Sequence, residues 1–195
     1  MITARVSHVA AFARWKEDED MPIGVLINQI TSNVQTESMA KGTAFHRFLE
    51  HVREGSETNE VTIDGYTFAF AGEFDLHLPQ IRERRKEVDY GGIVVSGQCD
   101  AIEGRTIHDH KSTERFDSEK YLTGWQWRYY LDIFDADRFV WNIWEMNELQ
   151  EEKSYGVHHL HSLTQYRYPS LHDDCVAMAQ EYRDFAEKYL AKQTA

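Results

Sequence analysis

Two aspartates and a lysine within one short stretch could hold and use a divalent metal ion. If Glu103-Gly104 is a two-residue turn, the stretches on either side pair as an antiparallel hairpin, and Asp100, Asp109 and Lys111 project from the same face. Two carboxylates that converge in this way repel each other unless a cation lies between them. A cation held there can activate water and offset the charge on a phosphoryl group, and a nearby ammonium can stabilise the negative charge that develops. The alternative is that both aspartates are exposed beside the turn and that Lys111 pairs with one of them.

Two predicted helices carry polar residues that could complete such a site. His46 lies one helical turn after Gly42, which leaves room for close approach of backbone or ligand. After the hairpin, Gln126 and Tyr130 are four residues apart and therefore share one helix face. Other interpretations stay open, because a single helical histidine is often structural and a glutamine often lies at the boundary of an apolar face. The order is nevertheless informative, since the two helices flank the hairpin that carries the carboxylates.

The elements that must position these residues follow from hydrophobic periodicity and turn residues. Helices are predicted at Val6–Trp15, Glu37–Arg53, Ser118–Phe134 and Leu171–Lys192. Strands are predicted at Val61–Ile63, Tyr66–Phe70, Ile93–Ile102, Arg105–Lys111, Arg138–Met146 and Tyr155–Tyr166. The second hairpin is expected to pair Ile102 with Arg105, and the charged stretch Gln80–Asp89 is expected to be an exposed helix or loop. Thr36 is the expected N-cap of the second helix, and Gly55 its expected stop. This order predicts an α/β or α+β domain with a mixed sheet flanked by helices.

Length and composition set limits on the class of protein. The chain has 195 residues, 42% of them hydrophobic and 28% charged, which predicts one folded domain spanning residues 1–195. A net charge of −12 argues against charge-driven coating of nucleic acid or an anionic membrane, although a bound metal and local basic clusters could still serve a nuclease. Two cysteines, Cys99 and Cys175, are too few for an iron–sulfur cluster or a disulfide framework. No apolar run approaches membrane length, so we expect a cytoplasmic protein.

Further charged residues and histidines have open roles. The densest basic run contains Arg82, Arg84, Arg85 and Lys86, and it is either a solvated face or a loop that contacts DNA. Arg115 and Lys120 could hold phosphates near the metal, and Glu73 and Asp75 could add acidity to the site. His159 and His161 would share a strand face, but the sequence offers no cysteine or carboxylate at ligand spacing, so no metal site is expected there.

Taken together, these motifs resemble the PD-(D/E)XK nuclease superfamily, specifically its RecB-like and phage-exonuclease branch. The matching pieces are Gly42–His46, Ser96–Asp100, Asp109–Lys111 and Gln126–Tyr130, within a core of about residues 37–146. The resemblance implies a restriction-endonuclease-like αβββαβ core, a central mixed sheet flanked by helices, with an extra C-terminal helix. It also implies that His46, Asp100, Asp109 and the main-chain carbonyl of His110 hold Mg²⁺ or Mn²⁺. Lys111 would position the attacking water, and Gln126 and Tyr130 would line the site and contact the substrate backbone.

The function implied by the resemblance is metal-dependent hydrolysis of DNA by a phage-type exonuclease that acts in recombination and end processing. The implied partners are DNA, a single-strand annealing protein and further copies of the chain, in the cytoplasm of a bacterial cell, with neither a membrane nor an iron–sulfur cluster involved. Two other functions stay open. One is a non-catalytic DNA-binding or scaffold module on the same fold, and the other is a metal-dependent hydrolase that acts on a different substrate.

Overall fold

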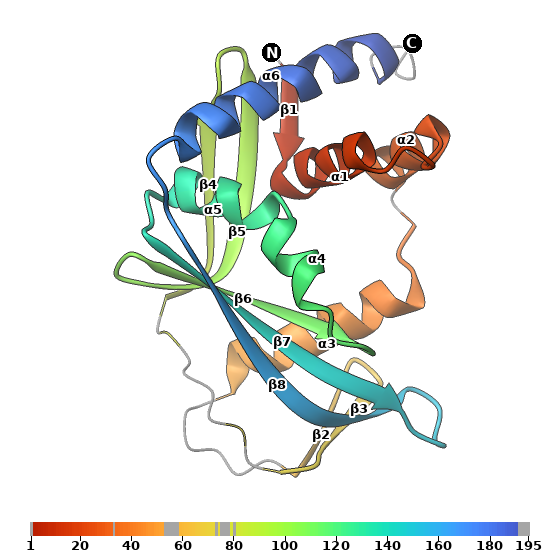
Figure 1. Ribbon diagram of the computed structural model, residues 1–195. Helices are drawn as coiled ribbons and strands as arrows, with labels where there is room; N and C mark the ends of the chain where they lie inside the picture. The colour runs from red at the N-terminus through yellow and green to blue at the C-terminus, as the bar shows by residue number, and fades with distance from the viewer. Residues whose placement is uncertain are drawn as a thin grey trace.

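The central element of the protein is a mixed β-sheet, which is strongly twisted in Figure 1. The computed structural model describes residues 2–32, 34–52, 59–72, 74, 79 and 81–190. Within these residues eight strands form one sheet, in the order β1-β5-β6-β7-β8-β3-β2, with β4 paired to β5. The strands are β1 (Ile2–Arg5), β2 (Glu60–Ile63), β3 (Tyr66–Phe70), β4 (Ile81–Asp89), β5 (Ile93–Glu103), β6 (Thr106–Thr113), β7 (Arg138–Glu148) and β8 (Ser154–Tyr166). The pairs β1–β5, β6–β7 and β3–β8 are parallel, and the other pairs are antiparallel.

Helices cover the sheet at two places and create two apolar clusters. They are α1 (Val6–Glu17), α2 (Ile23–Thr31), α3 (Glu37–His51), α4 (Ser118–Thr123), α5 (Gln126–Phe134) and α6 (Leu171–Tyr189). One cluster joins α1, α5 and α6 to β5 and β7, with Phe12, Tyr129 and Phe139 in its buried centre. The other joins α3 to β3, β7 and β8, around Phe45 and Trp144. Figure 1 shows the same division, with α6, α1 and α5 at one end of the sheet and α3 along the other half. The predicted mixed sheet flanked by helices is therefore confirmed. No described helix is long and apolar enough to cross a membrane.

Helix α3 forms for the reasons that its sequence indicated. The hydroxyl of Thr36 accepts a hydrogen bond from the backbone N–H of Met39 at 3.2 Å, which is the expected N-cap. Phe45 and Leu49 are buried on one face. The helix ends at His51, and the predicted stop at Gly55 lies outside the described residues, as do the predicted ends of the second and last helices.

Several sequence-based expectations were wrong in ways that have physical reasons. The stretch predicted as an exposed helix or loop is strand β4, which pairs antiparallel with β5 from Ile81↔Ile102 to Asp89↔Val94. Among the described strands, β4 pairs only with β5. Its charged, largely exposed side chains give it no apolar alternation, and they protect the edge from pairing with another chain. The single helix predicted over 118–134 is two helices, because the chain turns out of the helical conformation at Gly124. The elements β1 and α2 were not predicted at all.

The hairpin that carries the two aspartates has a different register from the predicted one. Ile102 pairs with Ile107 and not with Arg105, because the turn is formed by Gly104 and Arg105. Gly104 takes a φ of +56°, in the left-handed region that glycine adopts without strain. The shift is by two positions along β6, and a shift by an even number keeps every side chain on its face.

Gly97 of β5 packs closely against α5. A Cβ atom at position 97 would lie 2.9 Å from a ring carbon of Tyr130 and 3.2 Å from a methyl group of Val6. Gly97→Ala is therefore expected to lower the free energy of unfolding by about 1–3 kcal/mol, because both neighbours belong to packed elements. Gly24→Ala is the control, since a Cβ there meets nothing within 4 Å and should cause no loss. Urea denaturation measures both, and equal stability of the two variants would contradict this close packing.

Candidate active site

The site lies where two neighbouring strands separate. Strands β5 and β6 pair at only three positions, the last being Ala101↔His108, and the next residues along them are Asp100 and Asp109. From there β5 continues between β1 and β4, while β6 continues beside β7. The carboxylate of Asp100 enters the gap and accepts a hydrogen bond from the backbone N–H of His110 at 2.6 Å. The fork thus brings both aspartates to one place, with Asp100 half-buried and Asp109 1% exposed.

Asp109 is a buried carboxylate with incomplete hydrogen bonding. Gln126 donates to its Oδ1 at 3.2 Å, from the first turn of α5. The ammonium of Lys111 lies beside its Oδ2, yet among the described residues that oxygen has no hydrogen bond of regular geometry. A single ammonium compensates this buried carboxylate, and a divalent cation could bind the same oxygen.

His46 reaches the same fork from α3. Its Nδ1 lies 3.4 Å from Oδ2 of Asp100. Burial first, and then the nearby Lys111 ammonium, lower the pKa of His46, so the imidazole is held in the neutral form that ligates metals. Gly42, one turn earlier, does not mark a tight approach, because a Cβ there would meet only the Ser112 hydroxyl at 3.7 Å.

His110 contributes its backbone and not its ring. The ring is 4% exposed and lies on the α3 side, with Nδ1 3.5 Å from the indole nitrogen of Trp144. Burial lowers the pKa of this imidazole to about 3, so it stays neutral. Its main-chain N–H fixes Asp100, and its carbonyl lies 3.4 Å from Nζ of Lys111. Only that carbonyl is placed where a metal ligand is expected.

The ionised side chains at the fork carry an excess of negative charge, which favours the binding of a cation. Burial, and next the Asp109 carboxylate, raise the pKa of Asp100 well above its usual range. For Lys111, burial alone would lower the pKa, but the carboxylates of Asp109 and Asp100 outweigh it and raise the pKa. Lys111 is therefore an ammonium, and when both carboxyl groups are ionised one positive charge serves two carboxylates. Within the described residues no group of three or more His, Cys, Asp or Glu side chains is gathered as a ready-made metal site. Two carboxylates and a carbonyl nevertheless suit a hard cation that keeps several of its waters.

Helix α5 braces the fork through both of its predicted polar residues. Gln126 orients Asp109, as described above. The phenol of Tyr130 donates to the main-chain carbonyl of Gln98 at 2.9 Å, and the side chain is 8% exposed. Burial raises the pKa of Tyr130 well above its usual value, so the phenol stays neutral. Tyr130 positions β5 here, and its expected contact with a substrate backbone is not supported by this geometry.

Glu83 is a neighbour of the site that sequence reasoning missed. Its φ of +54° coincides with the one interruption of the β4–β5 ladder, at the position opposite Asp100. Its carboxylate accepts a hydrogen bond from Gln98, and it lines a small pocket with Glu50, His46 and Asp100. No sequence pattern in the charged stretch around position 83 distinguishes Glu83 from its neighbours. The two other acidic candidates, Glu73 and Asp75, lie outside the described residues.

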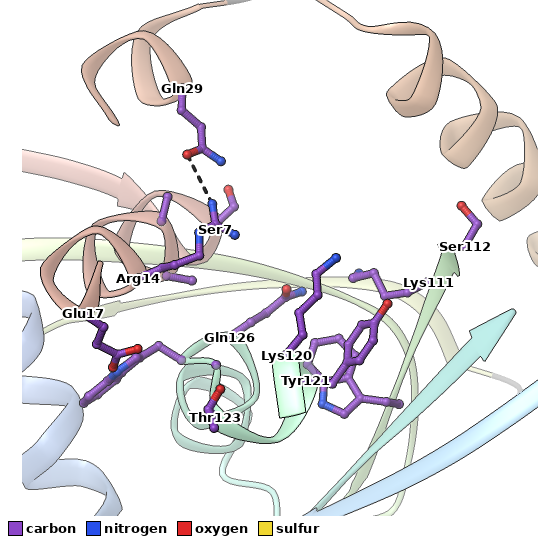
Figure 2. A pocket seen from close by; sticks show the side chains of 15 residues that line it. Ser7, Arg14, Glu17, Gln29, Lys111, Ser112, Lys120, Tyr121, Thr123 and Gln126 are labelled. Carbon is purple, nitrogen blue, oxygen red and sulfur yellow. Dashed lines mark hydrogen bonds between the residues drawn. The ribbon is translucent and has the colours of Figure 1, made fainter. Parts of the chain in front are cut away.

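A cleft of about 410 Å³ opens beside the fork. Lys111 and Gln126 line it from one side, and Arg14 and Gln29 line it from α1 and α2. Figure 2 shows Lys111 and Lys120 on one side of the opening and Arg14 and Gln29 on the other. A hydrogen bond of 3.2 Å joins Arg14 to Gln29. The cleft therefore presents three basic side chains. Lys120 was expected near the site, whereas the α1–α2 wall was not, and Arg115 is exposed on the segment after β6 and does not line the cleft.

The basic run of β4 divides into one structural residue and three exposed ones. The guanidinium of Arg82 donates to the carbonyls of Leu49 at 2.9 Å, Val52 at 3.3 Å and Pro79 at 3.2 Å, and also to that of Glu50. It therefore caps the C-terminus of α3, where carbonyls lack partners and positive charge is favoured, and it is not free to contact DNA as predicted. Exposed residues remain at positions 84–86, where Arg85 pairs with Glu87 at 3.0 Å.

Arg82→Met and Arg84→Met should separate these two roles. Arg82→Met is expected to lower the free energy of unfolding by about 1–3 kcal/mol, because several carbonyls lose a charged donor. Arg84→Met should change it by less than about 0.5 kcal/mol, because Arg84 is exposed. Chemical denaturation gives the stabilities, and fluorescence anisotropy with labelled DNA should show weaker low-salt binding for Arg84→Met. Equal stability of the two variants would refute the capping role.

Comparison with known proteins supports the fold. No family model and no curated protein sequence matches the chain. The solved structure of LHK-Exo in complex with dAMP superimposes with a TM-score of 0.50 at 13% identity, covering 98% of this chain and 92% of that one. The structure of SSO0001 gives a TM-score of 0.49 at 16% identity, covering 93% and 75%. At 13% identity the likeness to LHK-Exo concerns the fold alone. The chain therefore has a restriction-endonuclease-like fold, a central mixed sheet flanked by helices, which it shares with an exonuclease.

Proposed function

We propose that the protein is a metal-dependent nuclease that hydrolyses phosphodiester bonds of DNA, acting from strand ends as an exonuclease in recombination or end processing. The observation that carries this proposal is the fork itself. Two carboxylates, one of them almost fully buried, converge beside a single ammonium at the edge of a basic cleft. Similarity of fold to LHK-Exo, whose structure holds dAMP, supports a nuclease. In such a role a single-strand annealing protein would be a natural partner.

Asp100, Asp109 and the His110 carbonyl would hold the Mg²⁺ or Mn²⁺, with His46 beside them. When bound, that cation would activate water and offset the charge on the phosphoryl group. The chain's own residues perform the remaining tasks. The His110 N–H and the Gln126 amide fix the two carboxylates. Lys111 is protonated, so it cannot accept a proton, but it can donate a hydrogen bond to the attacking water or to a phosphate oxygen as negative charge develops.

The cleft explains how an acidic protein could bind an acidic substrate. Arg14, Lys111 and Lys120 line it, with Glu17 as the acidic residue at its rim. The overall charge of −12 disfavours DNA contact with most of the surface, so contact should concentrate on this strip and on the exposed basic residues at 84–86. DNA binding should therefore weaken steeply as salt is added.

End-labelled linear duplex, closed circular duplex and single strands, each with Mg²⁺, Mn²⁺ or a chelator, provide the test. The expected result is metal-dependent release of nucleotides from linear DNA, with closed circles intact. Asp109→Asn is the control for a contaminating nuclease, because it should be inactive under all conditions. Binding of DNA without hydrolysis under any metal would favour a non-catalytic module, and cleavage of closed circles would refute action from ends.

A further inference from the structure

A second cluster of metal-ligating side chains lies on the β7–β8 part of the sheet, on the face that also carries Lys111. Glu145 of β7 pairs directly with His159 of β8, and Ile143 pairs with His161. Opposed residues share a face, as do residues two apart on one strand. Glu145, His159 and His161 therefore project from the same face. The carboxylate missing from the histidine segment in sequence is supplied by the neighbouring strand.

Contacts within the cluster already join its members. Nε2 of His161 lies 2.8 Å from Oε2 of Glu145, and the rings of His159 and His161 have centroids 5.9 Å apart. The hydrogen bond from His161 lowers the pKa of Glu145 despite the opposing effect of burial, so the carboxylate is charged. Two ligand atoms that each lie about 2.1 Å from one cation are only slightly farther from each other than the Nε2 and Oε2 atoms of this pair.

The ring of His161 is held in place by an aromatic neighbour. Phe116, on the segment between β6 and α4, stacks on it with centroids 3.9 Å apart and planes 3° from parallel. His161 and Glu145 are partly exposed, with 30% and 24% of their side chains accessible, and His159 is exposed. The arrangement thus combines one fixed imidazole, one adjacent carboxylate and one imidazole free to move.

We propose that His159, His161 and Glu145 form a second divalent metal site, selective for an ion of the zinc class and separate from the carboxylate fork. Two imidazoles and one carboxylate are ligands that suit Zn²⁺ and related transition metals, whereas Mg²⁺ prefers oxygen alone. In their present orientation these three side chains do not form a group that could hold a metal ion, as is true of every such trio among the described residues. Binding requires a rotamer change of the exposed His159, which side chains of this kind undergo within nanoseconds.

Zn²⁺ titration calorimetry on the full chain tests the proposal. Asp100→Asn, which disables the fork, serves as the background, so that the remaining Zn²⁺ binding reports this cluster. One equivalent is expected, with affinity reduced about ten-fold or more by His159→Ala, His161→Ala or Glu145→Gln. His158→Ala is the matched control, because His158 is the adjacent exposed histidine and its ring lies over Gly156.

Unchanged Zn²⁺ affinity in His159→Ala or Glu145→Gln, or an equal loss in His158→Ala, would overturn the site. The readout is metal binding and not DNA hydrolysis. An inactive protein that still binds Zn²⁺ here would contradict the nuclease proposal alone, and an active protein without this binding would contradict only the second site.

Discussion

Replacing Lys111 by alanine is expected to lower kcat for DNA hydrolysis by about a hundred-fold or more while the protein still binds a divalent cation. Lys111 is the ammonium beside Asp109, and it also lies 3.4 Å from the His110 carbonyl. A protonated lysine carries no lone pair for a metal. Its contribution should therefore concern charge that develops during the reaction, and its loss should appear in kcat more than in metal affinity.

The metal-free variant should reveal a second task of the same side chain. Asp109 is 1% exposed, and without Lys111 its charge is left uncompensated. Lys111→Ala should lower the stability of the metal-free protein by about 1–2 kcal/mol, less than for a fully buried pair, because about a third of the lysine is exposed. Added Mn²⁺ should then raise the Tm of the variant more than that of wild type, since the cation takes over the neutralising role.

Lys120→Ala is the matched control, because Lys120 lines the same cleft, whereas among the described lysines it is Lys111 that forms the ion pair with Asp109. It should raise KM and weaken the salt dependence while leaving kcat within a few-fold. Activity of Lys111→Ala within a few-fold of wild type, or a loss no larger than that of Lys120→Ala, would contradict the role assigned to Lys111.

The aspartate hairpin shows what could be predicted from sequence and what could not. Alternation along β5 and β6 indicates which side chains share a face. This part of the prediction is correct although the predicted turn is wrong. The register itself could not be predicted, because Glu103-Gly104 and Gly104-Arg105 are both acceptable turns and glycine fits either. Burial of one face of the sheet determines which residues of a strand point toward that face. Only the full set of contacts determines which residues of the two strands lie opposite each other.

Other features depended on contacts between distant segments. The α1–α2 wall of the cleft lies about 100 residues from Lys111 in sequence, and neither Arg14 nor Gln29 belongs to a motif. The sequence suggested Arg82 as a possible DNA contact, because the residues around it do not indicate that its side chain binds the end of α3. Glu145 faces His159 only because β7 and β8 pair in one particular register. Hydrophobic periodicity predicts the helix or strand to which a residue belongs. The roles of these residues depend instead on a different helix or strand that lies beside them.

Asp100→Asn should abolish hydrolysis and, unlike most substitutions of half-buried charges, leave the metal-free fold as stable as wild type or more stable by about 2 kcal/mol at most. Burial and the Asp109 carboxylate both disfavour the ionised form of Asp100, and its pKa is raised accordingly. The amide removes that charge and keeps an oxygen that can accept from the His110 N–H. Metal binding should be lost with the carboxylate, so the rise in Tm that Mn²⁺ produces in wild type should disappear.

The pH dependence of this difference follows from the direction of the pKa shift. A carboxyl group whose folded-state pKa is raised is destabilising when ionised, and the penalty vanishes when it is protonated in both states. The stability advantage of Asp100→Asn in metal-free protein should therefore be greatest above the raised pKa and should shrink as the pH falls toward about 4, the usual value for aspartate. Differential scanning fluorimetry across this range, with a chelator present, measures it.

Asp109→Asn gives the contrast that makes the result specific. Both aspartates are needed for the proposed metal, so both variants should be inactive and show no Mn²⁺-dependent rise in Tm. Asp109, however, is the partner of Lys111 and is almost fully buried, so its loss should destabilise the metal-free protein where loss of Asp100 does not. If Asp100 were instead a structural partner of a cation, Asp100→Asn would have a markedly lower metal-free Tm, and wild type would show no response to Mn²⁺. That outcome would remove the physical basis for a metal site at the fork, because two carboxylates held together without strain would need no cation between them.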